Sequence, residues 1–308
     1  MILLDSIHAN GLAISARCEY GEEGEREILQ EARDGISKII RSFEISNVAN
    51  YWTRSEKGFA DRFPCVRLPY PVCWFEARGE ILDMVSMKLT GQSARSGALV
   101  RECVVPEGFR PAEYPDIPPA YVLLLRFFHQ LSSDLGKQPV VWCGGASFPV
   151  DASGALYYAT GSTDPRCTIY TPGVSRTPAE KEVFRTDEML RCCRVLAALS
   201  LLHCKNVSAR EVEPPGALLK ALAKRGKRPP VRYSVIEVTG AQTSGGDGSG
   251  SDRMYGRHIC RGHFKQFTES NKLFGKHTGL YWWDHHLRGS AEKGVILSDY
   301  KVGEEPRA

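Results

Sequence analysis

The residues best suited to chemistry gather in one segment, residues 253–288 of this 308-residue chain. Five of the chain's eight histidines lie there, mixed with arginines, lysines and aromatic side chains, whereas only Glu269 and Asp284 oppose the positive charge. Cations attract phosphate, aromatic rings stack on bases, and imidazoles transfer protons or bind metal. Burying so many ionisable groups unpaired would be costly, so we expect this segment to form a functional surface.

The first interpretation of this segment is a surface that contacts RNA or a partner protein. Arginine and lysine would hold a phosphate backbone, and a tyrosine or tryptophan would stack on a base. The alternative is a basic, solvated hairpin whose aromatic residues turn inward. The predicted contact residues are Arg257, Arg261, Gly262, His263, Lys265, Tyr281, Trp282 and Arg288.

A second interpretation is a metal-independent ribonuclease. Cleavage through the ribose 2′-hydroxyl needs a general base, a general acid and a cation for the developing phosphorane charge. His258 or His263 would supply one proton-transfer group, and His277 or His285 the other. Arg261 would supply the cation.

Strand geometry limits which of these residues can act on the same phosphate. If the residues around Gly262 form one strand, His258 and His263 point to opposite faces because their separation is odd. Arg257, Arg261 and His263 would instead share a face, and Gly262 would allow close backbone approach. We therefore keep His258 and His263 as candidates and assign no catalytic residue.

A histidine-based metal site is a third, weaker interpretation. His285 and His286 could bind zinc or manganese together with His277, His263 or Asp284. Adjacent histidines on a strand point apart, however, and the segment has no recognised metal-ligand spacing. We expect no metal and no cofactor.

The composition is that of an ordinary globular protein. The hydrophobic fraction is 42%, the charged fraction is 25%, and the net charge is only +4, so the basicity that matters is local. No apolar run approaches the length of a membrane span, and we expect no membrane partner. A phosphate-binding loop and a nucleophile elbow are also absent from the sequence.

The cysteines predict a reducing compartment. Most of the ten lie in apolar or strand-like runs, and none forms a CxxC pair. The apolar start of the chain stops at Asp5, too soon for a signal peptide. We therefore expect reduced thiols and a cytoplasmic protein.

Hydrophobic patterning predicts the elements that must hold the basic segment. An amphipathic helix is expected over 25–43, and a long helix over 177–203, where Thr177, Pro178 and Glu180 form an N-terminal capping pattern. His203, at its end, is interpreted as a core-edge histidine. The other predictions are strands over 72–78, 81–89, 97–105, 140–143, 155–160, 231–238, 257–264, 280–283 and 294–302, a turn at 79–80, a strand or helix over 121–131, and a basic loop over 220–228.

These elements predict an α+β fold, with a largely antiparallel sheet, packed helices and a basic aromatic C-terminal hairpin. We divide the chain into a mixed α/β core over 1–239, a flexible glycine- and serine-rich loop over 240–252, and a C-terminal segment over 253–308. The last segment is short for an independent domain, so we expect it to pack on the same core.

Two short tracts resemble a known family. Residues 68–76 read LPYPVCWFE and residues 261–264 read RGHF. Both are similar to motifs of the phage and mobile-element family of the type V-A anti-CRISPR protein that suppresses biogenesis of its CRISPR effector nuclease. The buried helix and the 231–238 strand fall in the same order. This sequence departs from the pattern at Cys260, where a second arginine is expected.

The resemblance implies a regulator rather than a metabolic enzyme. Such a protein recognises the N-terminal polypeptide of its target as it emerges from the ribosome, and the message is then lost. An extended peptide would add a strand to a sheet edge near Pro69, Trp74 and Glu76. The alternative interpretation, which burial statistics for tryptophan favour, is that Trp74 is a core residue. The implied partners are a nascent polypeptide and mRNA or the ribosome, in the cytoplasm of a bacterial host.

Overall fold

A computed structural model of the protein provides its architecture. The residues that it describes are 3–14, 21–46, 48, 63–83, 88–104, 121–134, 137–157, 167–170, 178–226, 229, 231–238, 256–260, 263–283, 286–288 and 290–295. The 240–252 loop and residues 296–302 of the last predicted strand therefore lie outside the described residues.

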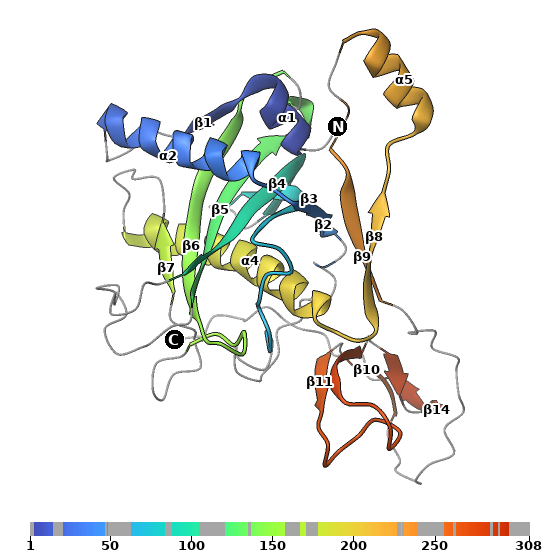
Figure 1. Cartoon of the computed structure of the whole chain (residues 1–308). Coiled ribbons are helices and arrows are strands. Elements are labelled where there is room, and N and C mark those ends of the chain that lie inside the picture. The colour runs from blue at the N-terminus through green and yellow to red at the C-terminus, as the bar shows by residue number, and fades with distance from the viewer. Residues whose placement is uncertain are drawn as a thin grey trace.

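A nine-stranded mixed sheet organises the fold (Figure 1). Its strands are β1 Leu12–Ile14, β2 Arg41–Glu44, β3 Val72–Asp83, β4 Lys88–Val104, β5 Tyr121–Leu131, β6 Val140–Val150, β7 Thr168–Tyr170, β8 Val207–Val212 and β9 Tyr233–Val238. They follow the order β1-β6-β5-β4-β3-β2-β9-β8, with β7 also paired to β6. The run from β3 to β6 is antiparallel, whereas β2 pairs in parallel with both β3 and β9.

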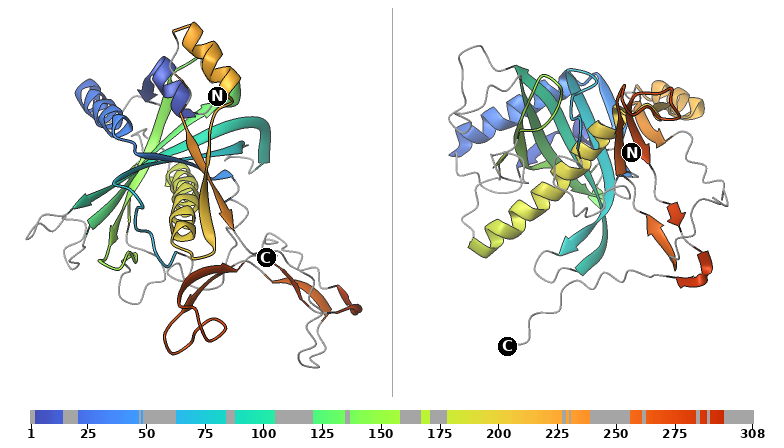
Figure 2. Two further views of the ribbon diagram at one scale, coloured as in Figure 1. Left: turned by 45° about the vertical axis from the view of Figure 1, so that its right-hand side comes forward. Right: turned by 90° about the horizontal axis from the view of Figure 1, so that it is seen from below.

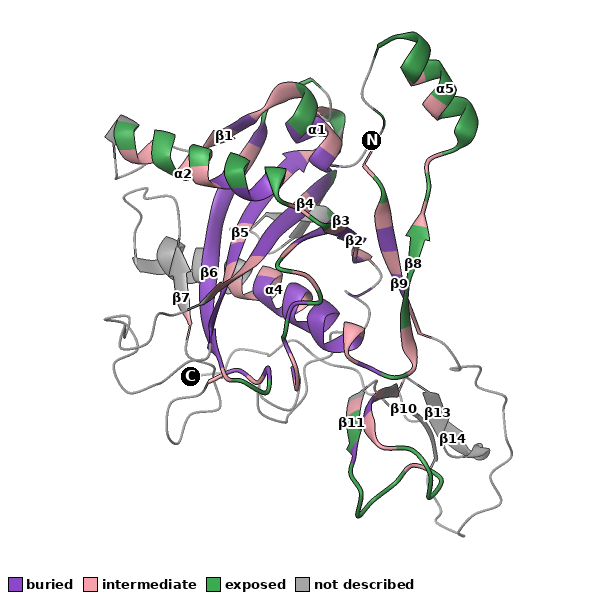
Figure 3. Ribbon diagram, in the orientation of Figure 1, coloured by how far each residue is buried: buried purple, intermediate pink, exposed green. Residues whose placement is uncertain are grey.

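Helices cover both faces of this sheet (Figure 2). They are α1 Leu3–Asn10, α2 Gly21–Ser37, α4 Pro178–Leu202 and α5 Gly216–Lys224, with a short 3-10 turn η2 at Ser132–Asp134. The helices α1 and α2 pack on one face, and α4 packs on the other. The helix α5 joins β8 to β9 and contains no buried residue (Figure 3).

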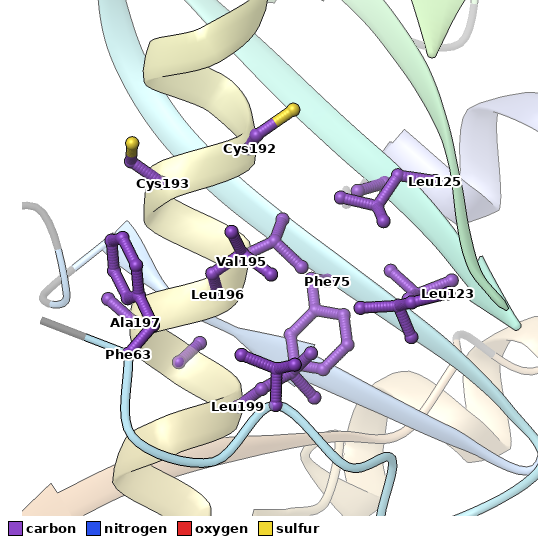
Figure 4. Close-up of a cluster of buried hydrophobic side chains, with 14 of the residues drawn as sticks. Phe63, Phe75, Leu123, Leu125, Cys192, Cys193, Val195, Leu196, Ala197 and Leu199 are labelled. Carbon is purple, nitrogen blue, oxygen red and sulfur yellow. The ribbon is translucent and has the colours of Figure 1, made fainter. Parts of the chain in front are cut away.

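Strand alternation in β3 divides the core into two clusters. Trp74 faces α1 and α2, whereas its neighbour Phe75 faces α4. On that second side Val195, Leu196 and Leu199 of α4 meet the sheet (Figure 4). Burying a large apolar side chain such as Phe75 stabilises the fold by about 1.5–3 kcal/mol.

The C-terminal strands form two small sheets. These strands are β10 Gly256–Cys260, β11 His263–Phe267, β12 Gly279–Trp283, β13 His286–Arg288 and β14 Ser290–Val295. One sheet has the order β13-β10-β14, and the other is the antiparallel hairpin of β11 and β12.

The structure confirms the predicted α+β class with its largely antiparallel sheet. It also decides the 121–131 run, which is strand β5. The predicted turn at 79–80 is wrong, because β3 continues through it to Asp83. A register shift follows at residues 80–82, so Gly79 lies beside a bulge rather than in a turn.

Four further element predictions are corrected. The helix expected over 25–43 is α2, which ends at Ser37, and strand β2 begins at Arg41. The single strand expected over 81–89 is divided between the end of β3 and the start of β4. The expected strand over 155–160 is only a single bridge between Leu156 and Val150 within the described residues 155–157. The expected basic loop over 220–228 is largely helix α5. Leu218 and Leu222 lie four residues apart among alanines and lysines, which are strong helix formers. The basic residues in this segment led to the prediction of a loop, although the leucines have helical spacing.

Candidate nucleic-acid interface

The strands β11 and β12 of the basic segment form an antiparallel hairpin. Its register pairs Phe264 with Trp282, Lys265 with Tyr281 and Phe267 with Gly279. The Phe264 side of the hairpin meets the body of the protein, because Phe264 packs against the main core and Leu280 is buried in it. The Lys205 amide also donates to the Leu280 carbonyl at 2.8 Å.

The other face of the hairpin carries one lysine and several aromatic rings. The Lys265 ammonium lies 5.1 Å from the Phe267 ring centroid and 5.2 Å from that of Trp283. Phe267 itself packs edge-on against Tyr281, with ring centroids 5.7 Å apart. An ammonium over an aromatic face is held by the ring quadrupole. This face therefore holds a cation in place over an aromatic cluster.

The tip of the hairpin presents a second aromatic group. Phe274 is 83% exposed and has a φ of 52°, the single positive φ among described residues other than glycine. Gly275 follows with a φ of 70° and completes the turn. Lys276 and His277 are exposed beside it. A bulky side chain in the left-handed region is an outlier that a turn must hold in place.

One acidic group also lies at the tip. Glu269 pairs with Lys272, with 2.7 Å between the ammonium nitrogen and the carboxylate oxygen. Glu269 is highly exposed, so this surface ion pair adds little stability. Lys276 and Lys265 leave the hairpin with more positive than negative charge.

The structure corrects the single strand that was predicted over 257–264. That segment is divided between β10, which ends at Cys260, and β11, which begins at His263, and the two belong to different sheets. Arg261 and Gly262 lie outside the described residues. The alternation argument that placed Arg257, Arg261 and His263 on one face therefore no longer holds, because it needs a continuous strand.

The other predicted contact residues are distributed over several strands. Arg257 and His258 are positions of β10, and Arg288 is a position of β13, where it pairs with His258. Lys265 is exposed and Tyr281 is half-buried on the cation-bearing face. The register puts position 282 opposite Phe264, on the core-facing side of the hairpin.

The residues predicted to bind peptide have different environments. Pro69 is exposed. Trp74 is fully buried, so the structure supports its alternative interpretation as a core residue. Glu76 is 3% exposed and accepts hydrogen bonds from the Leu3 amide at 2.8 Å and from the Trp74 indole at 3.2 Å.

Glu76 also forms a buried ion pair with Arg95, with 2.5 Å between its Oε1 and Nη1 of the arginine. All these contacts lie inside the protein and hold the start of α1 against the sheet. The prediction that Trp74 and Glu76 contact a peptide is therefore corrected, because both side chains are enclosed by α1 and the sheet.

A groove between α1, α2 and the ends of β2 and β9 offers a more open surface. Its volume is about 680 Å³. Apolar residues of both helices line it, and Ile40 at its rim is 58% exposed. Arg33, Arg41 and Arg232 also line it, with Glu211 as the acidic member. The lining thus combines apolar surface with positive charge.

A cysteine–histidine pair is the arrangement that the sequence did not reveal. Cys65 and His203 lie below the C-terminal end of α4, close enough that each shifts the pKa of the other, and the Cys65 thiol donates a hydrogen bond to the Ser153 carbonyl at 3.9 Å. His203 was predicted to be a satisfied core-edge residue, and its bond of 2.7 Å to the Arg67 carbonyl agrees with that. Its pairing with a thiol joins positions 138 residues apart, beyond the reach of any local motif.

Metal ligands do not gather in the part of the chain that the structure describes. No group of three or more histidine, cysteine or carboxylate side chains suited to a metal ion occurs among these residues. The eight described cysteines are free thiols. No described helix has the length and apolar character needed to cross a membrane.

Comparisons with known proteins found no match. Neither the protein-family models, nor the curated proteins, nor the solved structures include one that the chain resembles significantly. The clues to the function of this protein are therefore its own residues and the resemblance of the two short tracts.

Proposed function

We propose that this protein is an anti-CRISPR-like regulator of the bacterial cytoplasm. It binds the nascent N-terminal polypeptide of a target protein, contacts the mRNA or the ribosome through its C-terminal hairpin, and promotes loss of that mRNA. The resemblance of residues 68–76 and 261–264 supplies the biological setting. The hairpin geometry supplies the physical support, and the exposed ring of Phe274 is the observation that carries it.

The backbone conformation and exposure of Phe274 are typical of a residue that contacts a ligand. Its left-handed backbone costs on the order of 1–3 kcal/mol. Its ring is 83% exposed, so burial in the free protein returns almost none of that cost. Stacking on an unpaired base would bury the ring and gain about 1–3 kcal/mol. The free energy gained on binding RNA would thus offset the cost of this backbone conformation, which is not offset by burial in the free protein.

The surroundings of Phe274 favour single-stranded RNA over a duplex. Loops and ends of RNA present splayed bases that stack on aromatic side chains, whereas paired bases are already stacked. Lys276 is only two residues from Phe274, so it could contact the phosphate next to the stacked base. Lys265 adds positive charge farther along the hairpin. A cationic strand pair with an aromatic tip therefore suits a single strand.

In this proposal the groove beside α1 and α2 binds the nascent polypeptide. Its apolar lining would take apolar side chains of an extended N-terminal segment. Arg41 and Arg232 already pair with Glu211, and Arg232 also pairs with Glu213. Together with Arg33 the three arginines still outnumber these two carboxylates, so the groove would favour acidic groups in that segment. The target polypeptide is therefore expected to combine apolar and acidic residues.

Ribonuclease activity remains the alternative, and one observation weighs against it. His263 pairs with Trp283 at the open end of the β11–β12 hairpin, whereas His277, a proposed partner for it, lies at the tip beside Leu273. A general acid and base must both reach one phosphate. The described geometry thus favours binding over intrinsic cleavage.

Incubation with RNA in two settings tests the proposal. Purified protein is first mixed with bare reporter RNA, and then with a translating bacterial extract that makes the target polypeptide from the same RNA. Binding without cleavage in the first setting, and loss of RNA in the second, is the expected result. Cleavage of bare RNA would favour the ribonuclease, and an intact message in both settings would contradict the regulatory role.

A further inference from the structure

The helix α5 lies at one end of the strand pair β8–β9, away from the main sheet (Figure 1). It contains no buried residue, and most of its residues are exposed (Figure 3). Pro214 and Pro215 connect it to β8. The proline rings fix the backbone angle φ, which limits the motion of this connection. The helix is therefore a surface element that is held at a defined end of the sheet.

The charges on and after α5 have a single sign. Lys220 and Lys224 are exposed on the helix, and Arg225 is exposed at its C-terminal end. Lys227 and Arg228 follow in the sequence, and no acidic residue occurs from position 216 to position 228. The segment thus places five cations within a short stretch of chain without an opposing carboxylate.

The carboxylates of the neighbouring strands pair with other cations. Arg232 lies 3.6 Å from Glu211 and 3.3 Å from Glu213, and Arg210 of β8 lies 2.6 Å from Glu237 of β9. Within the described part of the chain, none of these acidic groups pairs with a cation of α5. The positive charge of α5 is therefore available to an external anionic partner.

The two lysines of α5 share one side of the helix. Residues four apart in a helix are neighbours on its surface, so the ammonium groups of Lys220 and Lys224 extend from the same side. Leu218 and Leu222 lie on the opposite side, because two residues advance an α-helix by about 200°. Like charges at this spacing destabilise a helix. A bound anion would relieve the repulsion between the two lysines.

The residue types of α5 favour phosphates as these anions, and a double helix as their source. Lysine and arginine contact phosphate oxygens without reading the bases. The helix has no aromatic residue, so it cannot stack on an unpaired base as Phe274 can. Double-helical RNA is recognised mainly through its shape and its backbone, which suits a helix with cations alone.

A lipid surface fits α5 less well. A helix that lies in a membrane interface buries a broad apolar face among the lipids. The helix α5 is only nine residues long, and Leu219 and Leu222 are half-buried in the protein. Leu218, which is 44% exposed, is the one leucine of this helix that is largely open to solvent.

The position of α5 complements that of the C-terminal hairpin. The hairpin contacts the chain just before β8, where the Lys205 amide donates to the Leu280 carbonyl, and α5 follows the other end of β8 (Figures 1 and 2). A strand of six residues is roughly 20 Å long at about 3.3 Å per residue. One RNA with a stem and an unpaired segment can therefore contact both elements.

We propose that α5 binds double-helical RNA through its phosphates, as a second RNA contact in addition to that of the hairpin. This inference rests on the proposed function in one respect, since it takes RNA as the ligand from it. Lys220 and Lys224 each contact a phosphate, and Arg225 adds positive charge at the end of the helix. Because the contacts are with the backbone, binding does not depend on the base sequence.

Salt-dependent binding of a blunt-ended RNA duplex to the full chain tests this surface. The wild type is compared with Lys220→Gln/Lys224→Gln, since glutamine keeps a similar helix propensity. Each phosphate contact with a double helix contributes about 0.9 to the slope of log affinity against log salt concentration, so we expect the double variant to reduce the slope by about 1.8. Lys38→Gln/Lys137→Gln is the matched control, because it removes two exposed lysines elsewhere and should leave the slope unchanged.

Three outcomes would overturn the inference. They are equal slopes for the wild type and the α5 variant, an equal reduction in the control variant, and binding of vesicles of phosphatidylglycerol and phosphatidylcholine in place of the duplex. Circular dichroism verifies that both variants are folded.

A parallel titration with an unstructured single-stranded RNA separates this inference from the proposed function. If the single strand binds through Phe274 while the duplex slope is unaffected by Lys220→Gln/Lys224→Gln, the inference about α5 fails alone. If the duplex binds through α5 while the single strand does not bind, the role of the hairpin fails alone.

Discussion

The ammonium group of Lys265 lies 5.2 Å from the ring centroid of Trp283, on the facing strand of the same hairpin. The same ammonium lies 5.1 Å from Phe267, so one cation spans two rings of the aromatic cluster. These rings already have partners within the protein. The ring of Phe274 at the tip is instead 83% exposed. The hairpin thus has a self-contained aromatic face and an open aromatic tip.

Phe274→Ala is expected to weaken binding of single-stranded RNA by roughly five- to 150-fold, because base stacking is worth about 1–3 kcal/mol. Fluorescence anisotropy with a labelled unstructured RNA measures the affinity. Leu218→Ala is the matched control, since Leu218 is also a large exposed apolar residue but lies on α5. Equal loss in both variants, or none in Phe274→Ala, would contradict a role for the tip.

Lys276→Gln tests phosphate contact separately from stacking. Each phosphate contact with a single strand contributes about 0.7 to the slope of log affinity against log salt concentration. We expect the variant to reduce that slope by about this amount, and Phe274→Ala to leave the slope unchanged. Titrations at several potassium chloride concentrations provide the slopes. Identical slopes for wild type and Lys276→Gln would show that Lys276 contacts no phosphate.

Arg95→Met is expected to destabilise the protein by about 3–5 kcal/mol, because it leaves the buried carboxylate of Glu76 without its cation. The pair is nearly inaccessible, with side-chain exposures of 6% for Arg95 and 4% for Glu76. Urea unfolding followed by circular dichroism measures the change. Arg78→Met is the control, since Arg78 is exposed and faces Arg95 in the β3–β4 register. Similar losses in both variants would argue against a special cost of the buried pair.

Gly97→Ala tests the packing of Trp74. A Cβ at position 97 would overlap the Trp74 ring and crowd Leu3, so the sheet and α1 would have to move apart. We expect a loss of about 1–3 kcal/mol. The near-ultraviolet circular dichroism of the tryptophans should change as well. Gly79→Ala is the control, because a Cβ there meets nothing within 4 Å. An unperturbed Gly97→Ala would place Trp74 elsewhere.

The contribution of His203 to stability should depend on pH. Its hydrogen bond with Cys65 raises the pKa in the folded state above the ordinary value of 6.5, so folded protein binds the proton more tightly than unfolded chain. The resulting stability is full below the unfolded pKa and is lost as pH rises through the folded pKa. We expect His203→Gln to lower Tm more near pH 6, below the ordinary pKa, than at alkaline pH. A difference in Tm that is constant with pH would contradict the assignment.

Local patterns in the sequence predicted most of the elements. The aromatic and branched residues after Pro71 gave strand β3, and the Thr177–Glu180 pattern gave a helix that begins at Pro178. Both signals act within a few residues. Helix α5 was missed because its lysines suggested a solvated loop, although its leucines have helical spacing.

Long-range contacts explain the remaining differences. Trp74 was compatible with a binding surface as well as with the favoured core position, and only the packing of α1 over β3 decides between them. Nothing local to Cys65 predicts that His203 lies beside it. The division of the 257–264 run between two sheets likewise depends on which strands β10 and β11 pair with.

Crosslinking of the protein to RNA in bacterial cells, followed by sequencing, is the most direct test of the central claim that the C-terminal hairpin contacts a message during translation. The wild type is compared with Phe274→Ala, with His263→Ala in the predicted contact tract, and with Leu218→Ala as the control. We predict enrichment of one or a few messages near their start codons, lost in the two hairpin variants and kept in the control. RNA recovery at background in the wild type, or equal recovery in all four proteins, would contradict the claim.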